Sequence, residues 1–90
     1  NAAKMAYIIS ERSEEITQKL LELDRGVTLL DGHGAWSGRR KDVILCAFGR
    51  SLIVPIKKLV QEIDPDAFVI VCQAAEVLGE GFGTYTPGGL

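Results

Sequence analysis

The sequence is poor in the residues from which most metal and catalytic sites are built. Its 90 residues include two cysteines and one histidine. Cys46 and Cys72 do not form a Cys-x-x-Cys motif, which argues against a zinc knuckle or a thioredoxin-type pair. His33 stands alone, so no site that needs two histidines can be built from one chain. We therefore expect no metal site, no cofactor and no enzymatic activity in this domain.

Long apolar runs and an excess of basic residues are also missing. No clean apolar run, residues 67–72 included, approaches the roughly 18 residues of a membrane-spanning helix. The N-terminal stretch carries no signal-peptide pattern. A formal net charge of −2 gives no electrostatic footprint for nucleic acid. These absences predict a soluble domain with no nucleic-acid partner.

The apolar residues that are present follow two periods. Short runs rich in β-branched and aromatic residues predict strands at 5–9, 27–30, 43–48 and 67–72. Helical spacing predicts two helices between them, and their buried stripes comprise Ile16, Leu20 and Leu23 in the first and Ile56, Leu59, Val60 and Ile63 in the second. The order is β-α-β-β-α-β, the split βαβ arrangement of ferredoxin-like folds.

The ends of the first helix are marked by polar residues and a glycine. Ser10 or Ser13 is expected to cap its N-terminus. Gly26 is suited to a left-handed position after its C-terminus.

Right-handed crossovers then give an α+β fold, with an antiparallel sheet of order 4-1-3-2 and two helices on one face. Cys46 and Cys72 would lie two strands apart, roughly 10 Å, too far for a disulfide. We predict a single ferredoxin-like domain over residues 4–82 and a glycine-rich tail over residues 83–90.

Several functions known on this fold lack their residues here. Acylphosphatases need an asparagine beside the first-loop arginine, but the only asparagine is Asn1. Heavy-metal chaperones carry Cys-x-x-Cys after the first strand, where this chain has Ser-Glu-Arg-Ser. RNA-recognition domains expose aromatic residues on the central strands, and Tyr7 and Phe48 are the only candidates on an acidic chain.

Two glycine-bearing segments remain as candidate ligand contacts, because glycines let backbone N–H groups approach a ligand. The candidates are Gly32, His33, Gly34, Trp36, Ser37 and Gly38 in the first segment, and Gly79, Glu80, Gly81 and Phe82 in the second. Neither segment has the spacing and the flanking strand and helix of a nucleotide loop. The plainer alternatives are a solvated histidine at a bent strand end and an ordinary tail.

The same two segments carry a family resemblance. Residues 31–38 read Asp-Gly-His-Gly-Ala-Trp-Ser-Gly, and residues 63–71, continuing to 76–82, hold a second motif. Together they resemble the C-terminal domain of YitT-family bacterial membrane proteins, a domain of unknown function, over about residues 4–82. The resemblance implies an upstream bundle of membrane helices and a position on the cytoplasmic side of the bacterial plasma membrane. It provides no catalytic residues.

Two hypotheses follow. The first is a regulatory domain that binds a small-molecule ligand and acts on the attached membrane domain. The second is an oligomerisation module, in which copies of the domain associate and cluster the membrane parts. The two are compatible, and a homo-oligomer is expected in either case.

Overall fold

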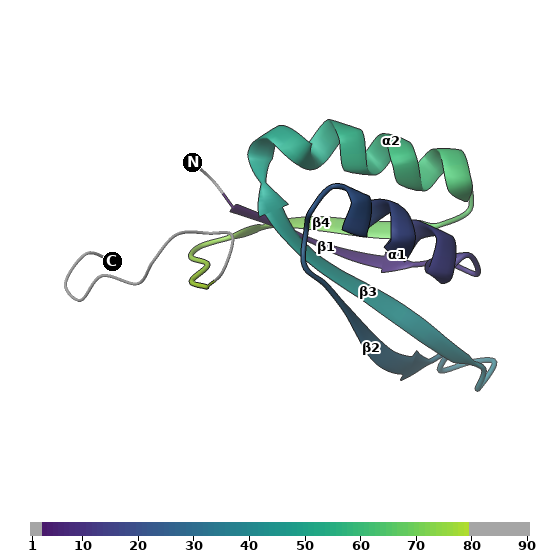
Figure 1. The fold of residues 1–90 in the computed structure, drawn as a ribbon. Coiled ribbons are helices and arrows are strands. Elements are labelled where there is room, and N and C mark those ends of the chain that lie inside the picture. Colours follow the sequence, from purple (N-terminus) through teal and green to yellow (C-terminus); the bar gives the residue numbers. More distant parts are fainter. Residues whose placement is uncertain (1–2, 80–90) are drawn as a thin grey trace.

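The elements of the protein follow the predicted order in a computed structural model, which describes residues 3–79 (Figure 1). The strands are β1 (Ala3–Ile9), β2 (Val27–His33), β3 (Arg40–Gly49) and β4 (Phe68–Ala74), and the helices are α1 (Ser13–Glu22) and α2 (Ile53–Ile63), with a 3₁₀ turn at Arg50–Leu52. The predicted βαββαβ order is confirmed. The predicted domain end at residue 82 and the tail at 83–90 lie outside the described residues.

The four strands form one antiparallel sheet in the order β2-β3-β1-β4. This is the predicted 4-1-3-2 order, read from the other edge. Strand β1 pairs through Ala6 with Cys46 of β3 and through Met5 with Cys72 of β4. It therefore separates the two cysteines, and both are free thiols as predicted.

Both helices cover one face of the sheet (Figure 1). Alternate residues of the central strands point towards them, because successive side chains of a strand point to opposite faces. Within residues 3–79 the fully buried residues are all apolar: Ala6, Ile8, Ile16, Leu20, Ile44, Cys46, Phe48, Ile56 and Val60. Burying each of the large ones contributes roughly 1.5–3 kcal/mol. This single layer of packing is the core of the domain.

The other face of the sheet, which we call the open sheet face, is covered by no helix among the described residues. Cross-strand partners share a face, so the register assigns its side chains strand by strand. From β2 to β4 they are Thr28 and Leu30, then Lys41, Val43, Leu45 and Ala47, then Ala3, Met5, Tyr7 and Ile9, and finally Phe68, Ile70, Cys72 and Ala74. Nearly all of them are apolar.

The β2–β3 hairpin is longer than predicted. The sequence indicated a strand that ends at Leu30, but β2 continues to His33, which pairs with Arg40 of β3. The additional residue pairs are polar, so a prediction based on apolar runs did not include them. The Arg40 guanidinium bonds the carboxylates of Asp31, at 2.5 Å, and Asp42, at 2.9 Å, and so ties the two strands together.

Both predicted ends of α1 differ in detail from the structure. Neither serine side chain caps the helix: the N-cap residue is Arg12, and Ser13 is already helical. The Ser10 hydroxyl instead accepts a hydrogen bond from the Arg12 amide, at 2.9 Å. At the other end Asp24, not Gly26, takes the left-handed conformation, with φ of 60°. Aspartate is one of the few residues besides glycine that adopt it.

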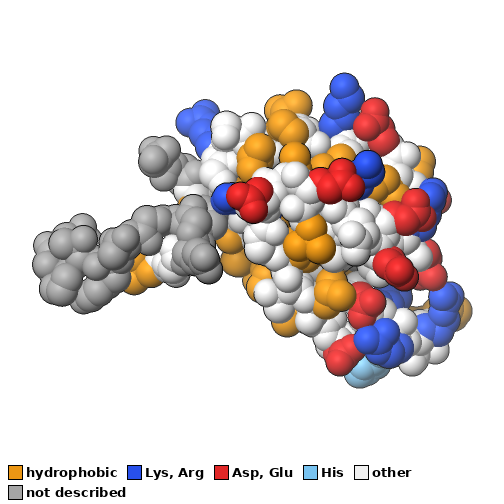
Figure 2. Space-filling view, in the orientation of Figure 1, with side chains coloured by type: hydrophobic (Ala, Val, Ile, Leu, Met, Phe, Trp, Pro, Cys, Tyr) orange, Lys and Arg blue, Asp and Glu red, His pale blue; other side chains and the backbone are white. Residues whose placement is uncertain are grey.

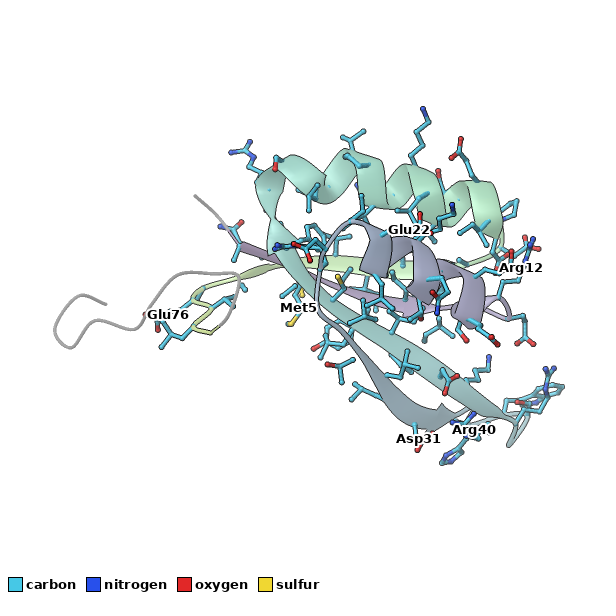
Figure 3. All side chains as sticks on the ribbon, viewed as in Figure 1. Met5, Arg12, Glu22, Asp31, Arg40 and Glu76 are labelled. Atoms are coloured by element: carbon cyan, nitrogen blue, oxygen red, sulfur yellow. The ribbon has the colours of Figure 1, made fainter. Side chains whose placement is uncertain are left out.

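Two residues that precede α1 form hydrogen bonds to the end of α2. The Ser10 hydroxyl donates to Asp64 at 2.5 Å, and the Arg12 guanidinium donates to the Ile63 carbonyl at 2.7 Å. Arg12 also forms a two-fold contact with Glu15, with both distances 2.7 Å (Figure 3). Arg12 therefore has a structural role, because it links the two helices. The hydrogen bond from Ser10, together with the Asp66 amide, lowers the pKa of Asp64 below its ordinary value.

The left-handed Asp24 predicts a specific pattern of stability. Replacing Asp24 with Ala should lower the free energy of unfolding by about 1 kcal/mol, because alanine pays the steric cost of a positive φ without the local hydrogen bonding of aspartate. Asp24→Gly should cause no loss, since glycine adopts this conformation freely. Urea unfolding of the three proteins tests this; equal stabilities of the Ala and Gly variants would contradict it.

The lowered pKa of Asp64 predicts a pH-dependent contribution to stability. A carboxyl whose folded pKa is below its unfolded value, near 3.9, stabilises the fold above that value and ceases to do so as the pH falls through the folded pKa. Asp64→Asn should therefore unfold at lower urea than the wild type at neutral pH, and the difference should shrink as the pH falls below the unfolded value and through the lowered folded pKa. Glu62→Gln, on the exposed side of α2, is the control and should show a smaller effect. A difference independent of pH would contradict this role.

Candidate functional site

The first candidate segment forms the tip of the β2–β3 hairpin. Gly32 and His33 are the last residues of β2, and His33 is exposed. Beyond them the Gly34 amide donates to the Arg39 carbonyl at 2.9 Å, and the Gly38 amide to the Gly34 carbonyl at 2.8 Å. These backbone donors are therefore used within the turn.

The local backbone structure explains why glycine occupies two positions of this tip. Gly38 has φ of 72°, a conformation that favours glycine. A Cβ at Gly34 would stand 2.6 Å from the Ser37 hydroxyl oxygen, which in turn accepts from the Arg39 amide at 3.1 Å. Trp36 is 99% exposed. The tip is a compact turn that presents one tryptophan.

The second candidate segment contributes to a groove through its first residue. Gly79 is the last described residue, with φ of 135°; Glu80, Gly81 and Phe82 lie outside the described residues. The groove has a volume of about 640 Å³. Its lining residues are Met5, Leu21, Asp24, Arg25, Gly26, Thr28, Leu45, Ala47, Val77, Leu78 and Gly79.

Three parts of the chain build this groove. Its floor is the open sheet face, through Met5 of β1, Thr28 of β2 and residues 45 and 47 of β3. The turn between α1 and β2 lies at one side, and residues 77–79 after β4 lie at the other. The starts of β1 and β2 and the ends of β3 and β4 all meet at this end of the sheet, which brings these distant segments together.

The groove combines an apolar floor with one charged side. Asp24 and Arg25 carry opposite charges there, and the Arg25 side chain donates to the Asp24 carbonyl at 3.0 Å. Thr28 adds a hydroxyl, and Gly26 offers an exposed backbone, with open space where a Cβ would stand. Behind the floor, burial raises the pKa of the Cys46 thiol, and the Arg25 charge partly offsets this. Such a lining can hold a small ligand with an apolar part and an anionic group.

Gly79, the described residue of the second segment, lies away from the hairpin tip that holds the first segment. Thr28, in the groove, and His33, at the hairpin tip, are five residues apart on β2, or roughly 16 Å. Figure 3 shows Met5 and Glu76 near one end of the sheet and Asp31 and Arg40 near the other. Asp24 and Arg25 were missed as site residues. The predicted topology could have identified them, because it already places the α1–β2 turn at the same end of the sheet as the end of β4.

Among residues 3–79, no group of three or more His, Cys, Asp or Glu side chains is placed to hold a metal ion.

No helix within that range is long and apolar enough to cross a membrane.

Comparison with known proteins identifies the family. The profile described as "Uncharacterized protein conserved in bacteria (DUF2179)" matches residues 25–79. The protein in the cccA 5′ region of Bacillus sp. (strain PS3) is 46% identical over 89% of this chain, which spans 54% of that relative. UPF0750 membrane protein YpjC of Bacillus subtilis is 44% identical over 90% of this chain, which spans 28% of it. YitT, of the same UPF0750 group, also matches.

Solved structures agree with the sequence relatives. The crystal structure of a DUF2179 protein from Eubacterium ventriosum has a TM-score of 0.70 and 38% identity, and covers 80% of this chain and 100% of its own. CPII from Thiomonas intermedia K12, bound to ADP, AMP and acetate, has a TM-score of 0.60 at 20% identity, over 83% of this chain and 89% of its own. The second likeness shows the fold alone.

The matched profile covers more than half of the chain, and the Eubacterium domain is matched over its whole length. The resemblance read from the two motifs is thereby confirmed. The chain belongs to the DUF2179 family, and its relatives include membrane proteins of the YitT group, in which it corresponds to a small part of the whole protein.

Proposed function

We propose that this domain is a regulatory module of a membrane protein and that it binds a small anionic ligand in the groove beside the α1–β2 turn. The observation that carries the proposal is the groove itself, where the open sheet face, residues 24–26 and residues 77–79 meet around about 640 Å³. That volume lies within the usual range of small-molecule sites, about 300–1,000 Å³.

The lining favours a ligand of mixed character. Met5, Leu45 and Ala47 would contact an apolar or planar part, and Arg25 would neutralise an anionic group. Hydrogen bonds to charged groups contribute about 1.5–3 kcal/mol. The groove offers no pair of nucleophile and base among its described residues, so we propose binding without covalent chemistry.

The choice of a nucleotide as first probe rests on a fold neighbour. CPII, a nitrogen regulatory PII-like protein from Thiomonas intermedia K12, is described as bound to ADP, AMP and bicarbonate. Its similarity to this chain is one of fold, so it supports a class of ligand to test. Adenine nucleotides also match the groove's combination of an apolar floor and a cation.

The regulatory role follows from the context of the relatives. In two UPF0750 membrane proteins the matching region is less than a third of the length. We therefore propose that this small module acts on the larger remaining part of the protein. We place it on the cytoplasmic side, because its two free thiols fit a reducing compartment.

A second candidate function, oligomerisation of the membrane proteins, is favoured by a different feature, the open sheet face. The two functions are compatible, because one domain can bind a ligand and also associate with a second copy.

The ligand proposal predicts that ADP or AMP, at millimolar concentration, raises the thermal unfolding temperature of the domain. Arg25→Ala should raise the dissociation constant at least about tenfold in calorimetry, because it removes the cation found among the groove's described lining residues. Arg50→Ala, which removes the same charge at the 3₁₀ turn outside the groove, should bind like the wild type. Circular dichroism first confirms that both variants fold. Unchanged binding by Arg25→Ala, or no thermal shift with either nucleotide, would refute the assignment of this groove.

A further inference from the structure

The open sheet face is unusual for the exposed side of an antiparallel sheet. Such a sheet with one face in water normally alternates apolar and polar residues along each strand. Strand β4 begins Phe-Val-Ile-Val-Cys, with Val69 and Val71 packed on the core and Phe68 and Ile70 on the open side. Near-continuous apolar strands are typical of sheets covered on both faces. The pattern therefore predicts a covering layer on each face of the sheet, and residues 3–79 supply only the helical layer.

The exposed apolar side chains gather into rows across the strands. Leu30, Val43, Ile9 and Phe68 form one row, and Thr28, Leu45, Tyr7 and Ile70 form the next. Phe68 is 60% exposed, Ile70 46% and Leu30 41%. Where all four described strands run side by side, the register places no charged residue on this face.

The opposite surface of the molecule is different. Figure 2 shows Lys and Arg side chains interspersed with Asp and Glu over the helix-bearing side. A mixed, charged surface of that kind is typical of a face that stays in water. The contrast marks the open sheet face as the side that is made for contact with protein.

We propose that a second copy of this domain packs face to face on the open sheet face. The rows where all four strands run side by side carry no charge to repel an identical face, since Lys41 lies beyond them towards the hairpin tip. A copy supplies a second apolar sheet of the same shape. Two sheets pack in this way about 10 Å apart, with the inner side chains of both forming one core. The arrangement would be isologous, since the same rows meet on both sides.

The area is close to the lower limit for a specific pair. Four strands of about seven residues cover roughly 440 Å² of flat sheet, at about 4.8 Å between strands and 3.3 Å per residue. Two copies would together cover roughly 900 Å² of flat area, and more of accessible surface because side chains are not flat. Specific interfaces begin near about 1,000 Å². We therefore expect a reversible pair of modest affinity.

The test uses the 90-residue chain. The Eubacterium structure consists of this domain alone, so the domain folds on its own. Light scattering after gel filtration, without added ligand and at roughly 100 µM, should give twice the monomer mass of 9.8 kDa. Ile70→Glu should reduce it to the monomer mass.

Leu29→Glu is the matched control. Leu29 is 49% exposed, against 46% for Ile70, but it lies on the opposite face of the sheet, opposite Ile44. This variant introduces the same charge and should keep the wild-type mass. Phe68→Glu is a second face variant, should Ile70→Glu fail to fold by circular dichroism. Neither Ile70 nor Phe68 lines the groove, so failure of this proposal leaves the ligand proposal standing, and the reverse also holds.

Alkylation gives an independent reading of the same contact. Cys72 lies on the open sheet face, and Cys46 is buried under the helices. Cys72 should react several-fold faster in Ile70→Glu than in the wild type at the same concentration, with Cys46 unreactive in both. The proposal would be overturned if the wild-type domain were monomeric at roughly 100 µM. It would also be overturned if this face bound the membrane part of the same protein and not a second copy of the domain. So would an Ile70→Glu variant with the wild-type mass.

Discussion

The pairing of β1 between β3 and β4 is the contact on which the rest of the structure depends. It aligns Ala6 and Ile8 with Ile44 and Cys46, and so forms the strip on which both helices pack. It also fixes which side chains point the other way, because a shift by one residue would exchange the two faces. The buried core and the open sheet face are thus two consequences of one register.

Apolar periodicity was enough to predict the element order, the strand order and the separation of the two cysteines, because each rests on buried apolar residues. It failed where polar contacts decide the structure. The last pairs of the β2–β3 hairpin are held by Arg40 between two carboxylates, and the turn after α1 uses Asp24 where the sequence favoured Gly26. Aspartate and glycine both suit a left-handed turn, so residue type alone could not choose between two positions so close in sequence.

The candidate site was predictable in part for a related reason. A glycine can be required by a backbone turn or by a close approach of the backbone to a ligand or another segment. The sequence alone does not distinguish these two reasons. At Gly34 and Gly38 the demand is the turn itself, whose amides donate hydrogen bonds to carbonyls of the same turn. At Gly79 the chain enters a groove with residues 24–26, some fifty positions away in sequence. Contacts at that separation come from topology, so they require the strand order before any motif can be interpreted.

The groove and the open sheet face share a floor, and this joins the two proposals physically. Leu45 lines the groove and also stands between Thr28 and Tyr7 in a row of the open sheet face. A ligand in the groove would therefore contact the same strands that meet a second copy. By linkage, a ligand that binds the paired form more tightly must strengthen pairing by the same factor, and one that needs the face uncovered must weaken it. Either sign would convert ligand concentration into a change in how the attached membrane parts associate, which is what a regulatory domain has to do.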